Sequence, residues 1–290
     1  MDIRKPIVAG QFYPGTMDGC LAEIAECLSR RTLTQTIDED IVAGIVPHAG
    51  WTFSGALAAL VFSAIKNRNQ HVDTFIIFGA THRYLDSNPA LYKNGPWQTP
   101  LGQVAIDEQM ADAVITTGHA VADTRAHSSE HSIEVQIPFI QHLFADAKIV
   151  PIVVPPAESA VSLGTAVGDI IAAGHKKVIC IGSTDLTHYG PGYGFTPMGT
   201  GDTALSWASA VNDRQFIDLA LKLDASGLLN NALSSQNACG PGAAAAAVAA
   251  AARLGKTKGL LLAHTSSSEV MRRRMRMSSE DSVGYAAIVF

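Results

Sequence analysis

Six short, almost continuously apolar runs constrain the fold of this chain more than any other feature of its sequence. They cover residues 41–46, 74–78, 148–154, 177–181, 259–263 and 283–290. A strand that helices cover on both faces has a sequence of this kind, whereas a strand with one solvated face alternates apolar and polar residues. The runs therefore predict the buried strands of a central sheet that is mostly parallel or mixed.

Helical patterns lie between these runs. Apolar residues recur at three- and four-residue steps over residues 17–28, after Thr16 as a candidate N-cap, and over residues 57–65, after Ser54. Further helices are predicted over residues 109–116, 131–144, 159–173, 204–223 and 242–254. Strands that alternate with helices predict an α/β fold of three layers, with helices flanking the sheet.

Composition patterns predict how these elements are organised. Residues 95–101 and 191–201 are rich in proline and glycine and are predicted to be loops. The alanine-rich block 243–252 predicts a tightly packed helix with small side chains. Because no internal repeat or linker-like tract is visible, residues 1–290 are predicted to form one domain.

The charge and the cysteines narrow the class of protein. The 290 residues include 21 Lys and Arg and 26 Asp and Glu, a net charge of −5, which argues against binding nucleic acid or a membrane surface. No apolar run approaches the roughly 20 residues that cross a bilayer, and no secretory signal pattern begins the sequence. The cysteines (Cys20, Cys27, Cys180 and Cys239) show no CxxC pair, so a cytoplasmic location is expected.

Three predicted strands end in a turn of small residues that is followed by a histidine. His48 follows the first run, His82 the second and His188 the fourth, where Asp185 lies in the same turn. Ligands in open α/β sheets bind beyond the carboxyl ends of strands, and parallel neighbours would bring these ends to one rim. Because imidazole is the commonest metal ligand and suits zinc, copper, iron and nickel, we expect a metal site there.

Cys239 is a fourth candidate ligand. It lies in a glycine-flanked turn that leads into the alanine-rich helix. The dipole and the free N–H groups of a helix N-terminus favour the thiolate form of a cysteine. The other three cysteines occupy apolar positions that are typical of inert core residues.

Residues 127–131 read His-x-x-Glu-His, the inverted zinc-peptidase pattern, which requires both histidines on one helix face. One of the two intervening serines is a candidate N-cap, which would leave His127 outside the helix. A second interpretation places His131 and Glu134 on one face, either at the pocket or orienting a metal ligand. A solvated surface pair is the third interpretation.

Aromatic and basic residues offer less specific signals. Trp51, Trp97 and Tyr189 are candidates for lining a groove, although aromatic residues beside glycine turns more often belong to a core. Arg272, Arg273, Arg274 and Arg276 form a basic cluster beside acidic residues, which usually indicates a solvated loop. An anion site is the alternative for this cluster.

The sequence resembles the Memo family, which includes AmmeMemoRadiSam system protein B of bacteria and archaea. Matching elements occur in the family's order along essentially the whole chain, at Ala9–Pro14, Pro47–Gly50, Gly79–His82, Glu130–Glu134, Ser183–His188, Ala238–Gly240 and Ser282–Ala286. The stretch Ala263–Glu269 and the arginines after it depart from the family's pattern, so the resemblance says little about the rim of the pocket.

The resemblance implies a fold like that of the class III extradiol, LigB-type ring-cleaving dioxygenases. It also implies a metal pocket with His48, His82 and Cys239 as ligands and Asp185 and His188 beside them, His188 matching an acid–base histidine. Family members are associated with copper or iron, with redox chemistry and, in animals, with cell motility and phosphotyrosine-peptide binding. An AMMECR-like domain and a radical-SAM protein are the partners that the resemblance implies.

Three functions are consistent with these observations. The first is a metal-dependent oxidoreductase with one iron or copper ion (zinc is the remaining candidate), in which His188 and Asp185 move protons. The second is a non-catalytic metal carrier or peptide-binding scaffold, whose ligand in the pocket would be a small molecule or a peptide. The third is a zinc hydrolase that uses His127, Glu130 and His131.

Overall fold

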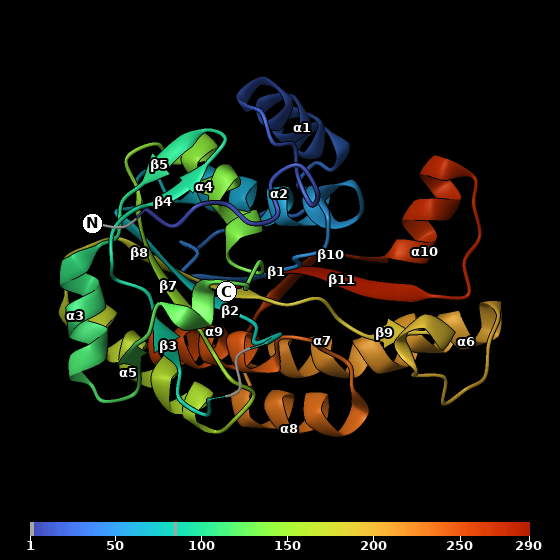
Figure 1. Ribbon diagram of the computed structural model, residues 1–290. Helices are drawn as coiled ribbons and strands as arrows, with labels where there is room; N and C mark the ends of the chain where they lie inside the picture. The colour runs from blue at the N-terminus through green and yellow to red at the C-terminus, as the bar shows by residue number, and fades with distance from the viewer. Residues whose placement is uncertain (1–2, 84–85) are drawn as a thin grey trace.

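The computed structural model describes residues 3–83 and 86–290, and its central sheet is mixed (Figure 1). The strand order is β10-β11-β1-β8-β2-β7-β3-β6, with β9 added on β11. The strands are β1 (Ala43–Val46), β2 (Thr74–Gly79), β3 (Ala90–Leu91), β6 (Val121–Ala122), β7 (Lys148–Val153), β8 (Val178–Ser183), β9 (His188–Tyr189), β10 (Leu260–Ser266) and β11 (Ser282–Val289). All six predicted strands are present.

The centre of the sheet is parallel, through β1, β8, β2 and β7. Strand β11 joins β1 in the antiparallel sense, β10 joins β11, and on the other side β3 is antiparallel to β7. Val46 of β1 lies opposite Ser183 of β8, and Phe78 of β2 lies opposite Gly182. The carboxyl ends of these three strands therefore share one edge of the sheet, where ligands of α/β proteins bind.

Helices cover both faces of the sheet and complete the three layers that the sequence predicted (Figure 1). One face carries α1 (Met17–Arg30), α2 (Trp51–Arg68) and α4 (Ile137–Leu143), and the other carries α5 (Ser159–Ala173), α7 (Asp213–Leu221), α8 (Ala225–Ser235) and α9 (Pro241–Arg253). Helix α3 (Glu108–Thr116) packs against α5. Helices α6 (Asp202–Trp207) and α10 (Ser267–Val270) lie near the end of the sheet where β10 finishes and β11 begins. Among the described residues, no helix combines the length and the apolar composition that a bilayer crossing requires.

Several predicted helices have different bounds in the structure. The prediction over residues 131–144 is wrong in its first part, which forms a turn and a 3-10 helix (Glu134–Gln136), because Pro138 is tolerated only in the first turn of an α-helix. The helix predicted over residues 204–223 is interrupted by a π-helical segment, Ala208–Asn212. Helix α2 starts at Trp51, ahead of the apolar pattern that follows Ser54, whereas Thr16 caps α1 as expected.

Other elements escaped the sequence patterns. The predicted loop over residues 95–101 contains β4 (Trp97–Thr99), which forms a separate hairpin with β5 (Gly102–Val104). Strands of two or three residues are too short to produce a recognisable alternation. Helix α8 contains glycine, serine and asparagine, which are poor helix formers, and it is stabilised by packing against α7 and α9.

Helix α9 is a tightly packed helix of small side chains, as the alanine block predicted. Its residues from Ala243 to Ala251 are buried. A Cβ atom added to Gly182 of β8 would lie 2.8 Å from the carbonyl oxygen of Ala243, and one added to Gly164 of α5 would overlap the carbonyl group of Ala246. Because alanine and glycine have small side chains, the backbone of α9 lies in contact with the backbones of α5 and β8 at these positions.

We expect Gly164→Ala to lower the free energy of unfolding by about 1–3 kcal/mol, because the added methyl group must push α5 away from α9. Urea denaturation followed by circular dichroism measures this loss. The exposed neighbouring substitution Thr165→Ala is the control and should change stability by no more than about 0.5 kcal/mol. Equal stability of the two variants would contradict the close α5–α9 contact.

Candidate metal centre

Three side chains from separate segments converge at the carboxyl edge of the sheet. His48 follows β1, His82 follows β2, and Cys239 precedes Gly240, the N-cap of α9. Each offers a ligand atom, and the three atoms lie within 4.8 Å of one another. Because β8 lies between β1 and β2 in the sheet, the two histidines reach the same edge. The structure thus brings together the three residues that the sequence analysis named as ligands.

The hydrogen bonds of His48 leave one ring nitrogen free for a metal. The hydroxyl group of Ser183 donates to the carbonyl oxygen of Ser132 at 2.8 Å, so its oxygen can only accept from His48 Nδ1, 3.2 Å away. His48 is therefore protonated on Nδ1, and its unprotonated Nε2 lies 3.1 Å from Cys239 Sγ. An outer hydrogen bond that fixes the tautomer in this way is typical of metal-binding histidines.

Glu130 holds His82 in the same manner. Its carboxylate accepts from His82 Nδ1 at 3.0 Å and from the backbone N–H groups of His82 and Ser132. Burial would lower the pKa of His82, but the hydrogen bond and the charge of Glu130 outweigh it and raise that pKa. Burial would raise the pKa of Glu130, but the hydrogen bond and the charge of His82 outweigh burial and hold that pKa far below its usual range. This carboxylate–histidine pair directs Nε2 of His82 toward the centre.

Cys239 is held as a thiol in the metal-free protein, which corrects the expectation of a thiolate at the helix N-terminus. Burial raises the pKa of the Cys239 thiol, and the nearby charge of Asp185 raises it further. The backbone N–H of Asp185 donates to Cys239 Sγ at 3.3 Å, but this bond does not compensate for burial. A bound cation would reverse the balance, because a thiol that coordinates a metal loses its proton.

A third imidazole, that of His131, packs on the other two. Its ring stacks on His82 with centroids 4.7 Å apart and meets His48 edge-on at 5.4 Å. Burial and the neighbouring imidazoles lower the pKa of His48 to about 3 and that of His131 to about 4. Both rings are therefore neutral near pH 7, the form in which histidine binds metals.

Asp185 and His188 lie beside the three donors. Asp185 Oδ1 accepts from the backbone N–H groups of His48, at 2.7 Å, and Ala49, at 3.3 Å, so this carboxylate fixes the loop that carries His48. Burial raises the pKa of Asp185 and lowers that of His188. The buried Nε2 atom of His188 has no hydrogen-bond partner within the described residues.

These side chains open into a cavity of about 480 Å³. Its wall contains the four histidines, Asp185, aromatic and apolar side chains, and a few hydroxyl and carboxylate groups. The lining residues are Phe12, His48, Ala49, Gly50, Phe53, His82, His131, Asp185, His188, Tyr193, Ser267, Met271, Ser279, Asp281, Val283 and Tyr285. A volume of this size suits a small molecule or one side chain of a larger partner.

Glu134 and Trp51, the other residues predicted at the pocket, face different surroundings. The Glu134 carboxylate is fully buried, pairs with Arg4, and accepts from the backbone N–H groups of Ile7 and Val8. It anchors the N-terminal segment and forms no pair with His131, because residues 131–133 form a turn rather than a helix. The Trp51 indole is buried among core rings and donates to the carbonyl oxygen of Val135 at 3.0 Å.

The arrangement of the His-x-x-Glu-His segment does not suit a zinc peptidase. His127 is buried away from the pocket and its Nε2 contacts the carbonyl oxygen of Ala90 at 3.0 Å. His131 and Glu130 lie at the centre instead, with His82. The two histidines of the motif therefore do not share a helix face, as the candidate cap between them suggested.

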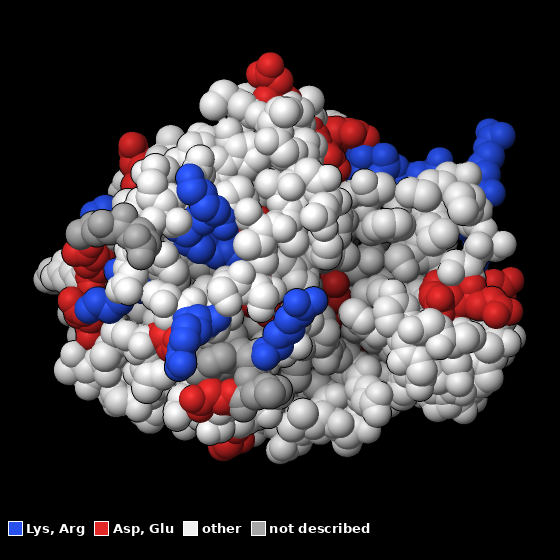
Figure 2. Space-filling view, viewed as in Figure 1, with Lys and Arg blue, Asp and Glu red and all other residues white. Residues whose placement is uncertain are grey.

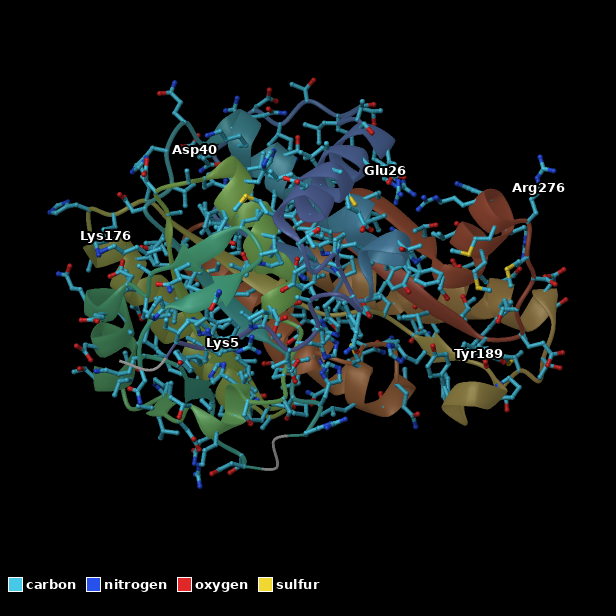
Figure 3. The ribbon with its side chains drawn as sticks, turned by 45° about the horizontal axis from the view of Figure 1, so that its top comes forward. Lys5, Glu26, Asp40, Lys176, Tyr189 and Arg276 are labelled. Atoms are coloured by element: carbon cyan, nitrogen blue, oxygen red, sulfur yellow. The ribbon has the colours of Figure 1, made fainter. Side chains whose placement is uncertain are left out.

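The remaining aromatic and basic candidates lie outside the cavity wall. Trp97 and Tyr189 are almost fully buried. The arginines after α10 pair with acidic side chains of other segments: Arg272 with Asp202, Arg273 with Glu269 and Arg274 with Glu26 of α1. Arg276 points away from the body of the protein (Figure 3). These contacts support the interpretation as a solvated segment over that as an anion site.

The sequence analysis missed several residues of this site. It noted Glu130 only as part of the peptidase pattern, and it did not name Ser183 as the partner of His48 or Tyr193, Tyr285 and Asp281 as part of the wall. Glu130 and Ser183 belong to the Memo-like segments, which is the one signal that could have found them. Tyr285 also lies in a Memo-like segment, Ser282–Ala286, whereas Tyr193 and Asp281 lie outside every segment that the sequence singled out as Memo-like.

The donor set fits a transition-metal ion. Metal–nitrogen bonds of about 2.0–2.1 Å and metal–sulfur bonds of about 2.3 Å place the ligands of one ion close to the separations found here. Two imidazoles with fixed tautomers and one thiol are ligands that suit copper, iron and zinc, and two histidines with one cysteine are also the ligand set of copper sites.

Comparisons with known proteins find relatives along nearly the whole chain. The family model for Memo-like proteins matches residues 4–289. A MEMO1 family protein of Thermococcus onnurineus is 38% identical over 296 residues, which cover 99% of both chains. One of Pyrococcus abyssi shows the same identity and coverage, and one of Methanosarcina acetivorans is 34% identical over 295 residues, covering all of this chain and 99% of its own. The similarity spans every segment that contributes to the cavity.

Proposed function

This chain belongs to the Memo-like protein family, and from that premise we propose that it is a metal-dependent oxidoreductase. One observation carries the proposal: His48, His82 and Cys239, three donors from distant segments, lie within reach of one ion. The outer contacts of the two histidines add support, because Ser183 and Glu130 occupy Nδ1 and leave Nε2 available.

We assign iron or copper to this site, with zinc as the remaining candidate. A bound iron or copper ion would supply a redox centre with open positions for oxygen or a substrate. The reducing cytoplasm expected from the cysteine pattern would keep Cys239 free to act as a ligand, and the cysteines of the structure are unpaired.

The protein's own residues would handle binding and proton transfer. His188 Nε2, buried at the cavity wall without a partner among the described residues, is placed to take a proton from a bound hydroxyl or amine group. Asp185 holds the His48 loop through two backbone N–H groups. The apolar wall, which includes Phe12, Phe53 and Tyr285, would bind the body of a substrate and exclude water from it.

The second candidate is a metal carrier or a scaffold that binds a peptide in the same cavity without reaction. The apolar and aromatic wall of the cavity, which suits one side chain of a peptide, supports it. An AMMECR-like domain and a radical-SAM protein are the partners that we propose for either function, on the basis of the family resemblance.

Metal analysis followed by oxygen exposure tests the proposal. Protein purified without added metal should contain about one transition-metal ion per chain, or bind one iron or copper ion when reconstituted without oxygen. On exposure to oxygen, with and without catechol-type compounds, the optical spectrum of the loaded protein should change and oxygen should be consumed. Bound metal without either change would support the metal carrier, and protein that binds no ion would refute both the oxidoreductase and the metal carrier and leave only the peptide-binding scaffold.

A further inference from the structure

Apart from its histidines, the ionisable side chains in the described wall of the cavity beside the metal centre include acidic groups but no basic ones. Its described lining includes two carboxylates, Asp185 and Asp281, and neither lysine nor arginine. Arg83, next to His82 in the chain, is exposed, and the arginines after Met271 already pair with acidic side chains. Figure 2 shows basic and acidic side chains scattered over the face in view, with a group of acidic side chains on the surface near α6.

Asp281 is separate from the metal donors. Asp185 belongs to a donor group with His188 and Cys239, but Asp281 belongs to none of the groups of three that the described residues form. One carboxylate cannot hold a metal ion alone, because metal sites need several ligands. The charge of Asp281 is therefore available to something other than the ion.

The partners of Asp281 hold its carboxylate without neutralising it. Asp281 Oδ1 accepts from the backbone N–H of Gly192 at 2.8 Å, and its own backbone N–H donates to Ser279 Oγ at 3.0 Å. No lysine, arginine or histidine among the described residues forms an ion pair with it. A half-buried carboxylate without a positively charged partner can interact favourably with a cation that enters the cavity.

Aromatic rings belong to the same cavity wall as this carboxylate. Phe12, Phe53, Tyr193 and Tyr285 belong to the same wall, and Tyr193 packs edge-on against His188 with centroids 4.9 Å apart. Aromatic faces attract cations, and they attract ammonium groups with particular strength when water is excluded. Rings and one unpaired carboxylate together favour a positively charged organic ligand over a neutral or anionic one.

We propose that the cavity takes a ligand with an ammonium group on an apolar body, and that Asp281 is the residue that selects it. This inference deepens the proposed function, since the same cavity would hold the substrate of the metal centre. The ammonium group would lie between Asp281 and the rings, and the apolar body would extend toward the histidines. Compounds with a carboxylate in place of the ammonium group would be repelled by Asp281 and Asp185.

The test compares three compounds of similar size, benzyltrimethylammonium, benzyl alcohol and phenylacetate, by isothermal titration on metal-free and zinc-loaded protein. The quaternary ammonium has no lone pair for a metal, so its binding reports on the wall alone. On the metal-free protein, where no zinc ion can coordinate the phenylacetate carboxylate, we expect it to bind at least about tenfold more tightly than the other two. Equal affinities on that form, or phenylacetate as its tightest ligand, would overturn the inference.

Two variants test whether Asp281 causes the preference for the ammonium compound. Asp281→Asn can still accept the Gly192 hydrogen bond and should lose the preference for the ammonium by about tenfold, with benzyl alcohol binding unchanged. Glu280→Gln removes a charge from the exposed neighbouring residue and should leave all three affinities unchanged. The same loss in both variants would mean that Asp281 is not the selecting residue.

Metal content measured on the same samples separates this inference from the proposed function. Retention of the ion by Asp281→Asn, together with the loss of ammonium preference, supports both. A protein that holds its ion but shows no ammonium preference refutes only the present inference. A protein that binds the ammonium but no ion refutes only the proposed function.

Discussion

Replacing Cys239 by serine is expected to weaken metal binding by more than about a hundredfold. Mutations of outer-shell partners of metal ligands typically cost about 10–100-fold, and here a ligand atom itself is lost. Serine keeps the size of the side chain and can accept the hydrogen bond from the Asp185 backbone N–H, so the turn before α9 should keep its conformation. A competition titration of zinc or copper(I) against a chromophoric chelator measures the change.

Two control variants make this result specific to the proposed site. Cys180→Ala removes a buried cysteine of β8 that does not line the cavity, and it should bind the ion as the unmodified protein does. His127→Gln removes a histidine that only the peptidase interpretation places on the metal, so it too should retain the ion. If Cys239→Ser retains full affinity, or His127→Gln loses it, the assignment of the ligands is wrong.

Glu134→Gln is expected to lower the free energy of unfolding by about 3–5 kcal/mol, the usual loss when one partner of a buried ion pair is removed. The substitution leaves the Arg4 guanidinium without its countercharge in the interior. It also places an amide N–H₂ group among donors, since the backbone N–H groups of Ile7 and Val8 and the Tyr13 hydroxyl all donate to this carboxylate.

Chemical denaturation monitored by tryptophan fluorescence measures this stability. Asp218→Asn, which breaks an exposed pair with Arg214 on α7, is the matched control and should cost no more than about 0.5 kcal/mol. The double substitution Arg4→Met with Glu134→Leu removes both charges and should recover part of the loss. A cost for Glu134→Gln no larger than that of the control would show that the N-terminal segment is not anchored by this pair.

The sequence predicted the sheet and most helices because local patterns determine them. Helix α5 has the predicted bounds, residues 159–173, and every predicted strand is present. The elements that the sequence failed to predict lack such a local pattern. Helix α8 depends on its packing partners rather than on its own residues, and β4 and β5 are too short to show a period.

The ligands of the centre could be predicted from sequence where they directly follow a strand or, as with Cys239, directly precede a helix. His48 and His82 share that position, and short turns leave little freedom in where their side chains emerge. Glu134 and His127 looked equally suited to chemistry, but distant partners, Arg4 and the Ala90 carbonyl group, determine where they point. Asp281 reaches the wall through contacts with residues some ninety positions earlier, which no local pattern encodes.

Strand β11 has a consequence for how the protein is made. This strand, residues 282–289, pairs in the antiparallel sense with β1 at the edge of the parallel centre of the sheet. It is synthesised more than 230 positions after β1. Until it emerges from the ribosome, β1 presents a row of backbone donors and acceptors that another chain could satisfy. Such distant pairing slows folding and leaves this edge open to pairing with other chains for as long as the C-terminal segment is missing.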